Sequence, residues 1–157
     1  MIDRAKPIVI LVADDDPEDC LLIRDALHES RLINDVRFVG DGEELMAYLE
    51  RRGNYADPLV SPRPGLILLD LNMPRKDGRE ALAEIKGDPR FRKTPVVILT
   101  TSKAEEDICR SYDLGVNSYI TKPVTFESLV ELMRTLRKYW FEIVELPPLD
   151  KCENVRQ

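Results

Sequence analysis

The chain has 157 residues, enough for one domain with a proper hydrophobic core but too few for a second folded module. Acidic residues outnumber basic ones by 29 to 23, and the net charge of −6 argues against binding to nucleic acid or to a membrane surface, because both need a basic face. The three cysteines show neither a disulfide framework nor zinc spacing, which fits a reducing cytoplasm, and the sequence shows no signal peptide or membrane span.

Strand-like and helix-like segments alternate five times along the chain. Strands are expected at 8–13, 35–40, 65–70, 94–100 and 116–121, and helices at about 17–30, 42–51, 77–87, 104–114 and 125–142. Residues that favour helix starts precede four of these helices: Asp16, Asp41, Ser102 and Thr125. Continuous apolar strands are typical of parallel sheets covered on both faces, so the sequence predicts an α/β fold with a doubly wound, five-stranded parallel sheet.

Two segments depart from this alternation. Arg51 to Pro64 has several prolines and no clear period, which indicates a long surface loop. After the last expected helix, the stretch from Phe141 to Leu149 is more apolar than a tail in water should be, so we expect it to contact another chain or to fold back over its own domain. The last helix itself carries one apolar stripe: Phe126, Leu129, Val130, Met133, Leu136 and Trp140.

Reactive side chains stand where four of the expected strands end: Asp14 and Asp15, then Asp70, then Thr100, then Lys122. Carboxyl ends of parallel strands share one edge of the sheet, and open α/β sheets bind their ligands there. Because like charges repel, the three acids are expected to share a hard divalent cation, magnesium, beside a phosphoryl group. Helix capping is the alternative role for these acids, but it needs only one acid, and Asp16 is assigned to it.

The ordered occurrence of these residues at successive strand ends resembles the receiver domain of two-component response regulators, over roughly residues 7–140. The resemblance implies a flavodoxin-like fold with strand order 2-1-3-4-5. It also implies a receiver domain over residues 1–142 and a C-terminal tail over 143–157 that could serve as a dimerisation arm. Such a protein is a phosphoacceptor switch, which promotes its own phosphorylation and dephosphorylation with Mg2+ but is not an enzyme.

The resemblance also assigns the chemistry residue by residue. Asp70 resembles the phosphoacceptor, which attacks the phosphorus of a phosphohistidine on a sensor histidine kinase. Thr100 and Lys122 would each stabilise a phosphoryl oxygen, where negative charge lies in the transition state. Carboxylates and one carbonyl would hold Mg2+: Asp15 and Asp70 directly, Asp14 mainly through bound water, and Asn72 through its backbone carbonyl.

Further positions match the family's conformational parts. Tyr119 stands at the place of the aromatic switch residue, which moves together with Thr100 on phosphorylation; the alternative is an ordinary half-buried strand tyrosine. Asn72 and Ser102 occupy positions that tune loss of the phosphoryl group. The Lys122–Pro123 bond is expected to be cis, as in family members. His28, the only histidine, is expected on the surface and not as a phosphodonor.

The leading functional hypothesis is a single-domain response regulator. The stretch after Pro123 is long enough for one helix and a tail but not for a DNA-binding module, so output is expected through protein contacts. The 51–64 insertion and the ending from Tyr139 to Pro147 are similar to regulators that partner phytochrome-type, light-sensing histidine kinases. By the same resemblance we expect a cytoplasmic homodimer formed through the C-terminal region, with no nucleic acid and no membrane as partner.

Two other functions share parts of this pattern. A magnesium-dependent phosphohydrolase of the haloacid dehalogenase type also uses a strand-end aspartate nucleophile, but it needs a second acid where this chain has Asn72. A flavodoxin-like nucleotide binder shares the fold, but its loop after the first strand is rich in hydroxyls and glycine. Here that loop is acidic and would repel phosphate. Turnover of a phosphomonoester separates the hydrolase from the switch.

Overall fold

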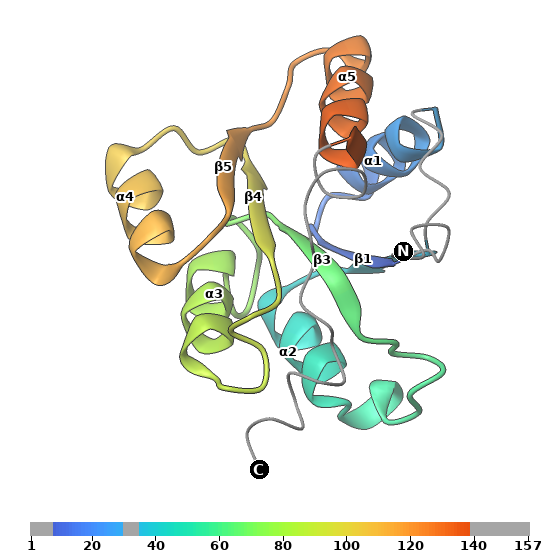
Figure 1. Cartoon of the computed structure of the whole chain (residues 1–157), viewed down its shortest axis with the longest axis vertical. Coiled ribbons are helices and arrows are strands. Elements are labelled where there is room, and N and C mark those ends of the chain that lie inside the picture. The colour runs from blue at the N-terminus through green and yellow to red at the C-terminus, as the bar shows by residue number, and fades with distance from the viewer. Residues whose placement is uncertain (1–7, 30–34, 139–157) are drawn as a thin grey trace, which may run out of the picture.

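The computed structural model describes residues 8–29 and 35–138, which form a five-stranded parallel sheet with order β2-β1-β3-β4-β5 (Figure 1). The predicted fold class and strand order are therefore confirmed. The strands are β1 (Val9–Ala13), β2 (Asp35–Val39), β3 (Pro64–Leu69), β4 (Val96–Thr100) and β5 (Ser118–Thr121). The helices are α1 (Pro17–Glu29), α2 (Gly42–Glu50), α3 (Gly78–Gly87), α4 (Glu105–Leu114) and α5 (Phe126–Arg137).

Helices cover both faces of the sheet, with α1 and α5 side by side on one face and α2, α3 and α4 on the other (Figure 1). Alternate side chains of β1 divide between the two cores: Leu11 packs towards α2 and α3, whereas Ile10 and Val12 pack towards α1 and α5. All six residues of β3 are buried. A strand with apolar neighbours on both faces has to be a continuous apolar run, which is the pattern that the sequence shows.

The register of the sheet brings the strand ends together. Ala13, the last residue of β1, lies beside Leu69, the last residue of β3, so Asp14 and Asp70 leave the sheet next to each other. The Asp70 amide donates to the Ala13 carbonyl at 3.0 Å and holds this arrangement. In β4 and β5, Thr100 pairs with the residue just before Lys122, which brings these two residues to the same edge.

Two glycines allow the loops at this edge to close tightly. A Cβ atom on Gly78, the first residue of α3, would lie 2.1 Å from the Asp70 carbonyl oxygen. A Cβ atom on Gly42, the first residue of α2, would lie 2.2 Å from the Lys76 carbonyl oxygen. Side chains at these positions would therefore collide with backbone, so both helices start where only glycine fits.

The segment between α2 and β3 has more internal structure than the loop signals predicted. It contains the 3-10 helix η1 (Gly53–Tyr55), and its Ser61 is buried and donates a hydrogen bond to the Tyr55 carbonyl at 2.7 Å. The Tyr48 hydroxyl donates to the Pro62 carbonyl at 2.6 Å. Most of the segment is still exposed, over 52–54 and 56–60, as expected of a surface loop, and Leu59 at 85% is the most exposed of its apolar residues. Proline and glycine predicted a loop, but they carried no signal for these longer-range hydrogen bonds.

Three of the four predicted helix starts are confirmed, because the side chains of Asp16, Asp41 and Thr125 accept hydrogen bonds from backbone amides of α1, α2 and α5. Ser102 does not cap α4 itself, because α4 starts after Ala104, which makes no side-chain cap. The Ser102 oxygen accepts from the Ala104 amide at 3.4 Å, just before the helix, and its hydroxyl donates to a side chain of α4.

On α5, four residues of the predicted stripe are buried, Leu129, Val130, Met133 and Leu136, whereas Phe126 is 41% exposed. Trp140 and the predicted tail over 143–157 lie outside the described residues. Within the described ranges, no helix has the length and apolar character needed to cross a membrane.

Candidate functional site

Three carboxylates converge at the carboxyl edge of the sheet. One oxygen from each of Asp14, Asp15 and Asp70 lies within 4.8 Å of the others, so the predicted acids are brought together. Asp14 and Asp70 are only 3% and 7% exposed, whereas Asp15 is exposed to solvent. Burial raises the pKa of Asp14 above its ordinary value, and the negative charge of Asp70 adds to this rise against hydrogen bonds from Lys122 and the Asp16 amide. These acids therefore cost free energy unless a cation lies among them.

Lys122 is the cation that the described residues themselves supply. Its Nζ atom lies 2.7 Å from Asp14 Oδ2, 2.7 Å from Asp19 Oδ2 and 3.1 Å from Asp70 Oδ2. Burial alone would lower the pKa of Lys122, but the hydrogen bonds from its ammonium group to Asp14 and Asp19 raise it above its ordinary value. The lysine is therefore charged, yet one ammonium group cannot neutralise all the carboxylates around it.

Asp19 was not predicted as part of the site. It lies in the first turn of α1. Because α1 starts soon after the end of β1, this turn lies close to the acidic cluster, and Asp19 reaches Lys122 from it. The helix start at Pro17 was a usable signal, because it fixes which residues of α1 face the sheet edge.

The predicted cis bond between Lys122 and Pro123 was wrong, because the described residues contain no cis peptide bond. The trans form is intrinsically the more stable one. Lys122 reaches its partners without a cis bond, since its amide donates to the Thr100 carbonyl at 2.8 Å and places the residue beside β4.

Thr100 and Asn72 orient the Asp70 carboxylate. The fully buried Thr100 hydroxyl donates to Asp70 Oδ1 at 2.8 Å, and the Asn72 amide donates to the same oxygen at 3.3 Å. The other oxygen, Oδ2, faces Lys122. Two donors on one oxygen and an ammonium group on the other fix the plane of the carboxylate.

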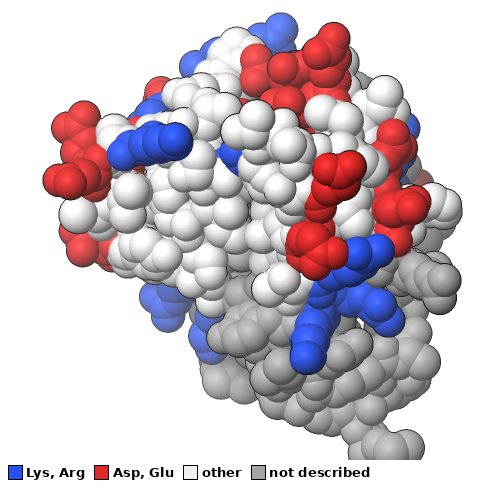
Figure 2. All heavy atoms as spheres, turned by 90° about the horizontal axis from the view of Figure 1, so that it is seen from above, with Lys and Arg blue, Asp and Glu red and all other residues white. Residues whose placement is uncertain are grey.

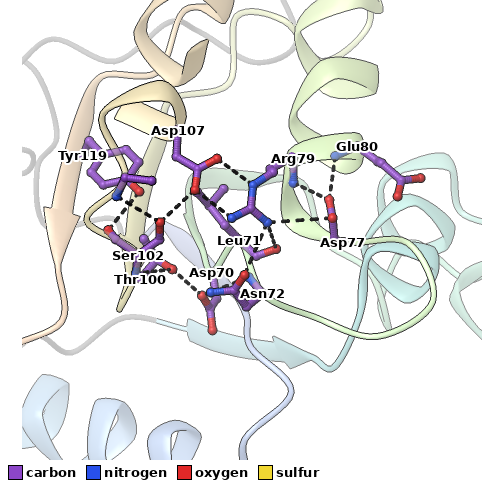
Figure 3. Close-up of polar contacts among 11 residues, drawn as sticks. Asp70, Leu71, Asn72, Asp77, Arg79, Glu80, Thr100, Ser102, Asp107 and Tyr119 are labelled. Atoms are coloured by element: carbon purple, nitrogen blue, oxygen red, sulfur yellow. Dashed lines mark hydrogen bonds and ion pairs between the residues drawn. The ribbon is translucent and has the colours of Figure 1, made fainter. Parts of the chain in front are cut away.

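A set of polar side chains connects this carboxylate to α3, α4 and β5 (Figure 3). The Tyr119 hydroxyl donates to the Ser102 carbonyl at 3.0 Å, while its ring packs partly buried against the core on the α2 and α3 side. The Ser102 hydroxyl donates to Asp107 at 2.7 Å, and Arg79 binds the same carboxylate with two nitrogens at 2.7 Å each. Neither Arg79 nor Asp107 was predicted, because nothing local in the sequence links two residues that are 28 positions apart and lie in different helices.

The donor set fits a hard divalent cation. All the candidate ligand atoms in the acidic cluster are carboxylate oxygens, which suit Mg2+ and Mn2+ better than softer metals. The excess of negative charge over the single lysine supplies the electrostatic reason for such an ion. When bound, the ion would neutralise negative charge on a phosphoryl group beside Asp70.

This fold, with acids, a threonine and a lysine at its ligand-binding edge, defines a phosphoacceptor switch domain. The family model for the response regulator receiver domain matches residues 10–134. The chain therefore belongs to the response regulator receiver family. Proteins of this family act as switches, take their phosphoryl group from a histidine kinase and bind a divalent metal ion, so membership favours the switch over the hydrolase alternative.

Among individual relatives, the chain is 44% identical over 141 residues to response regulator Rcp1 of Synechocystis sp., a match that covers 90% of this chain and 94% of Rcp1. The crystal structure of the phosphorylated cyanobacterial phytochrome response regulator RcpA is similar, with a TM-score of 0.84 and 45% identity over 91% of this chain and 100% of RcpA. The Mn2+-bound form of Rcp1 gives a TM-score of 0.82 at 44% identity, covering 90% of this chain and all of that one. The chain is thus related to phytochrome response regulators.

Proposed function

We propose that this protein is a single-domain response regulator that accepts a phosphoryl group on Asp70 from a phytochrome-type sensor histidine kinase. The observation that carries the proposal is the convergence of three carboxylates, Thr100 and Lys122 around the end of β3. The similarity to Rcp1 and RcpA supports the choice of kinase class.

In the proposed transfer, an Asp70 carboxylate oxygen bonds to phosphorus while the bond from phosphorus to the kinase imidazole nitrogen breaks, and that nitrogen keeps the electron pair. Lys122 already contacts Asp70 Oδ2 and stabilises charge that develops on a phosphoryl oxygen. Thr100 already donates towards the same carboxylate and can donate to a second phosphoryl oxygen. Asp70 therefore supplies the nucleophile, and the side chains around it contribute position and electric field.

Mg2+ is the proposed metal, and the acids supply its ligands. Asp15 and Asp70 would bind it directly, the Asn72 backbone carbonyl would complete the protein ligands, and Asp14 would act mainly through bound water. Octahedral Mg2+ keeps several waters and needs only one or two carboxylates, which suits a cluster with one exposed and two buried acids.

Output is proposed to occur through protein contacts. On phosphorylation, Thr100 and Tyr119 would shift together and change the surface around β5 and α4. Apolar side chains are exposed nearby: Val124, in the connection from β5 to α5, is 100% exposed, and Phe126, the first residue of α5, is 41% exposed. Figure 2 looks onto this end of the molecule and shows uncharged surface bordered by separate acidic and basic side chains, without the continuous basic face that a phosphate backbone needs.

The proposal also includes the assembly. Residues 1–142 form the receiver domain, and the tail over 143–157 serves as a dimerisation arm of a cytoplasmic homodimer. Light scattering at high micromolar protein concentration tests this part, and a monomer there would contradict it. Light-dependent transfer from a phytochrome-type kinase, compared with a histidine kinase that has no such sensor, tests the partner.

Incubation with Mg2+ and acetyl phosphate, followed by intact mass measurement, tests the acceptor. The wild-type protein should gain one phosphoryl group, and Asp70→Asn should gain none. Asp77→Asn is the matched control, because this nearby aspartate caps α3 and asparagine caps equally well. Modification of Asp70→Asn, or release of many phosphates per protein from a phosphomonoester, would contradict the proposal.

A further inference from the structure

Two chains of hydrogen bonds start at the same oxygen of Asp70 and meet again at an ion pair (Figure 3). The first chain runs through Asn72, whose backbone amide donates to Asp70 Oδ1 at 3.3 Å. The side-chain oxygen of Asn72 in turn accepts a hydrogen bond from Arg79 Nη1 at 3.3 Å. Arg79 on α3 is therefore two steps from the reacting carboxylate.

The second chain runs through the loop between β4 and α4. Thr100 donates to Asp70 Oδ1 at 2.8 Å and accepts from the Ser102 amide at 3.4 Å. The Ser102 hydroxyl then donates to Asp107 Oδ2 at 2.7 Å. Asp107 on α4 thus ends this chain, as Arg79 ends the other.

The ion pair between Arg79 and Asp107 closes these two chains into one ring. The guanidinium group makes two parallel hydrogen bonds of 2.7 Å to the carboxylate, a geometry that fixes both side chains. The hydrogen bond from Arg79 holds the pKa of Asp107 at about 2, so both partners are charged at neutral pH. The pair is only partly exposed, with side-chain exposures of 33% for Arg79 and 12% for Asp107.

We propose that Arg79 and Asp107 are positioning residues that lengthen the life of phosphorylated Asp70. Each occupies a polar atom that could otherwise bind an attacking water: Arg79 the amide oxygen of Asn72, and Asp107 the hydroxyl hydrogen of Ser102. The inference rests on the proposed function, since it concerns the same phosphoryl group.

The step in question is hydrolysis. A water oxygen bonds to phosphorus, the bond from phosphorus to the Asp70 oxygen breaks, and the products are the Asp70 carboxylate and dihydrogen phosphate, which keeps both water hydrogens. A free Asn72 amide oxygen could accept a hydrogen bond from that water and orient it. With the oxygen bound to Arg79, water loses this acceptor, and the phosphoryl group persists longer.

The test is the half-life of the phosphorylated protein, followed by intact mass after removal of acetyl phosphate. Arg79→Met and Asp107→Ala should each shorten the half-life by about fivefold, the effect of roughly one positioned hydrogen bond. Arg37→Met is the matched control, because Arg37 on β2 also makes two hydrogen bonds to one aspartate, at 2.7 and 3.0 Å, and its side chain is 35% exposed. This control should keep the wild-type half-life.

A charge swap separates positioning from a simple bridge between α3 and α4. The double variant Arg79→Asp with Asp107→Arg restores an ion pair, but residue 79 can no longer donate to Asn72 and residue 107 can no longer accept from Ser102. Its half-life should stay short. An Asn72→Leu background lacks the side-chain amide. There, Arg79→Met should change the half-life much less than it does in the wild type.

Several outcomes overturn the inference. A swap variant with the wild-type half-life would leave only a structural bridge, and so would an Arg37→Met variant with an equally shortened half-life. If the wild type and all variants are phosphorylated equally and lose the phosphoryl group at the same rate, this inference fails while the proposed function stands. If the wild type takes up no phosphoryl group at all, both fail.

Discussion

The two ends of β3 meet polar structure of opposite kinds. At its carboxyl end, Asp70 lies beside Asp14 and Asp15, and the single positive charge of Lys122 does not balance the three carboxylates. Before its amino end, the segment that contains Tyr55 and Ser61 pairs donors with acceptors inside the protein. The first arrangement needs a ligand to become stable, whereas the second is complete in itself.

The hydroxyl groups of Tyr48 and Tyr55 illustrate this completeness. Tyr48 donates to the Pro62 carbonyl at 2.6 Å, and Tyr55 donates to Glu44 Oε2 at 2.8 Å. Burial raises the pKa of both tyrosines to about 12, so their hydroxyls remain protonated donors at neutral pH. Buried groups satisfied in this way add stability, whereas a cluster that keeps an excess of negative charge can respond to metal and phosphate.

The largest expected effect comes from the tight backbone contact at the carboxyl end. Gly78→Ala should lower the free energy of unfolding by about 3 kcal/mol or more, because its Cβ atom would lie 2.1 Å from the Asp70 carbonyl oxygen. Gly87→Ala, at the other end of α3, is the control, since nothing lies within 4 Å of its added Cβ. Chemical denaturation measures both, and equal stability of the two variants would show that the edge is more yielding than its geometry indicates.

The next effect separates metal binding from stability. Asp15→Asn should weaken Mg2+ binding about tenfold or more, since it removes one of few carboxylate ligands. Without metal the variant should be as stable as the wild type or more so, because Asp15 is exposed and repels its acidic neighbours. Calorimetric titration and thermal unfolding measure the two effects.

Asp16→Asn is the control for this titration. Asp16 is adjacent in sequence, but it accepts a hydrogen bond from the Glu18 amide as a helix cap, a role that asparagine also fills. Its Mg2+ affinity should match the wild type. If Asp15→Asn also keeps full affinity, the acidic cluster is not the metal site.

At the amino end of β3 the expected effect is on stability alone. Tyr48→Phe should lower the free energy of unfolding by about 1–2 kcal/mol, because the half-buried Pro62 carbonyl loses the donor that the buried Tyr48 provides. Phosphorylation by acetyl phosphate should be unchanged, since the hydroxyl is remote from the site. A loss of phosphorylation without loss of stability would mean that the two ends of β3 are coupled.

The fold could be predicted from the sequence because it depends on local repetition. Five apolar runs separated by helical segments specify a parallel sheet, and parallel strands bring their ends to one edge. The site residues directly at these ends, such as Asp14, Asp70 and Lys122, follow from that rule.

The residues that were missed reach the site from within helices. Asp19 contacts Lys122 from α1, and the pair of Arg79 and Asp107 joins two helices. The helix start at Pro17 could have placed Asp19, but the place of Arg79 and Asp107 depends on helix packing and side-chain rotamers, which a single sequence does not encode as a pattern. The wrong cis bond before Pro123 has a similar origin, because the expected isomer came from the family resemblance and not from any local constraint in this chain.

The smallest expected effect concerns the ion pair between Arg79 on α3 and Asp107 on α4. Because Arg79 holds the pKa of Asp107 at about 2, below the ordinary 3.8, the pair stabilises the folded state fully above pH 3.8 and loses this contribution as the pH falls towards 2. Asp107→Asn should therefore cost about 1 kcal/mol or less at neutral pH, and this difference from the wild type should vanish at low pH. Denaturation curves at several pH values measure it. In an Arg79→Met background the pH dependence should disappear, and a difference that persists there would assign it to the hydrogen bond from Ser102 instead.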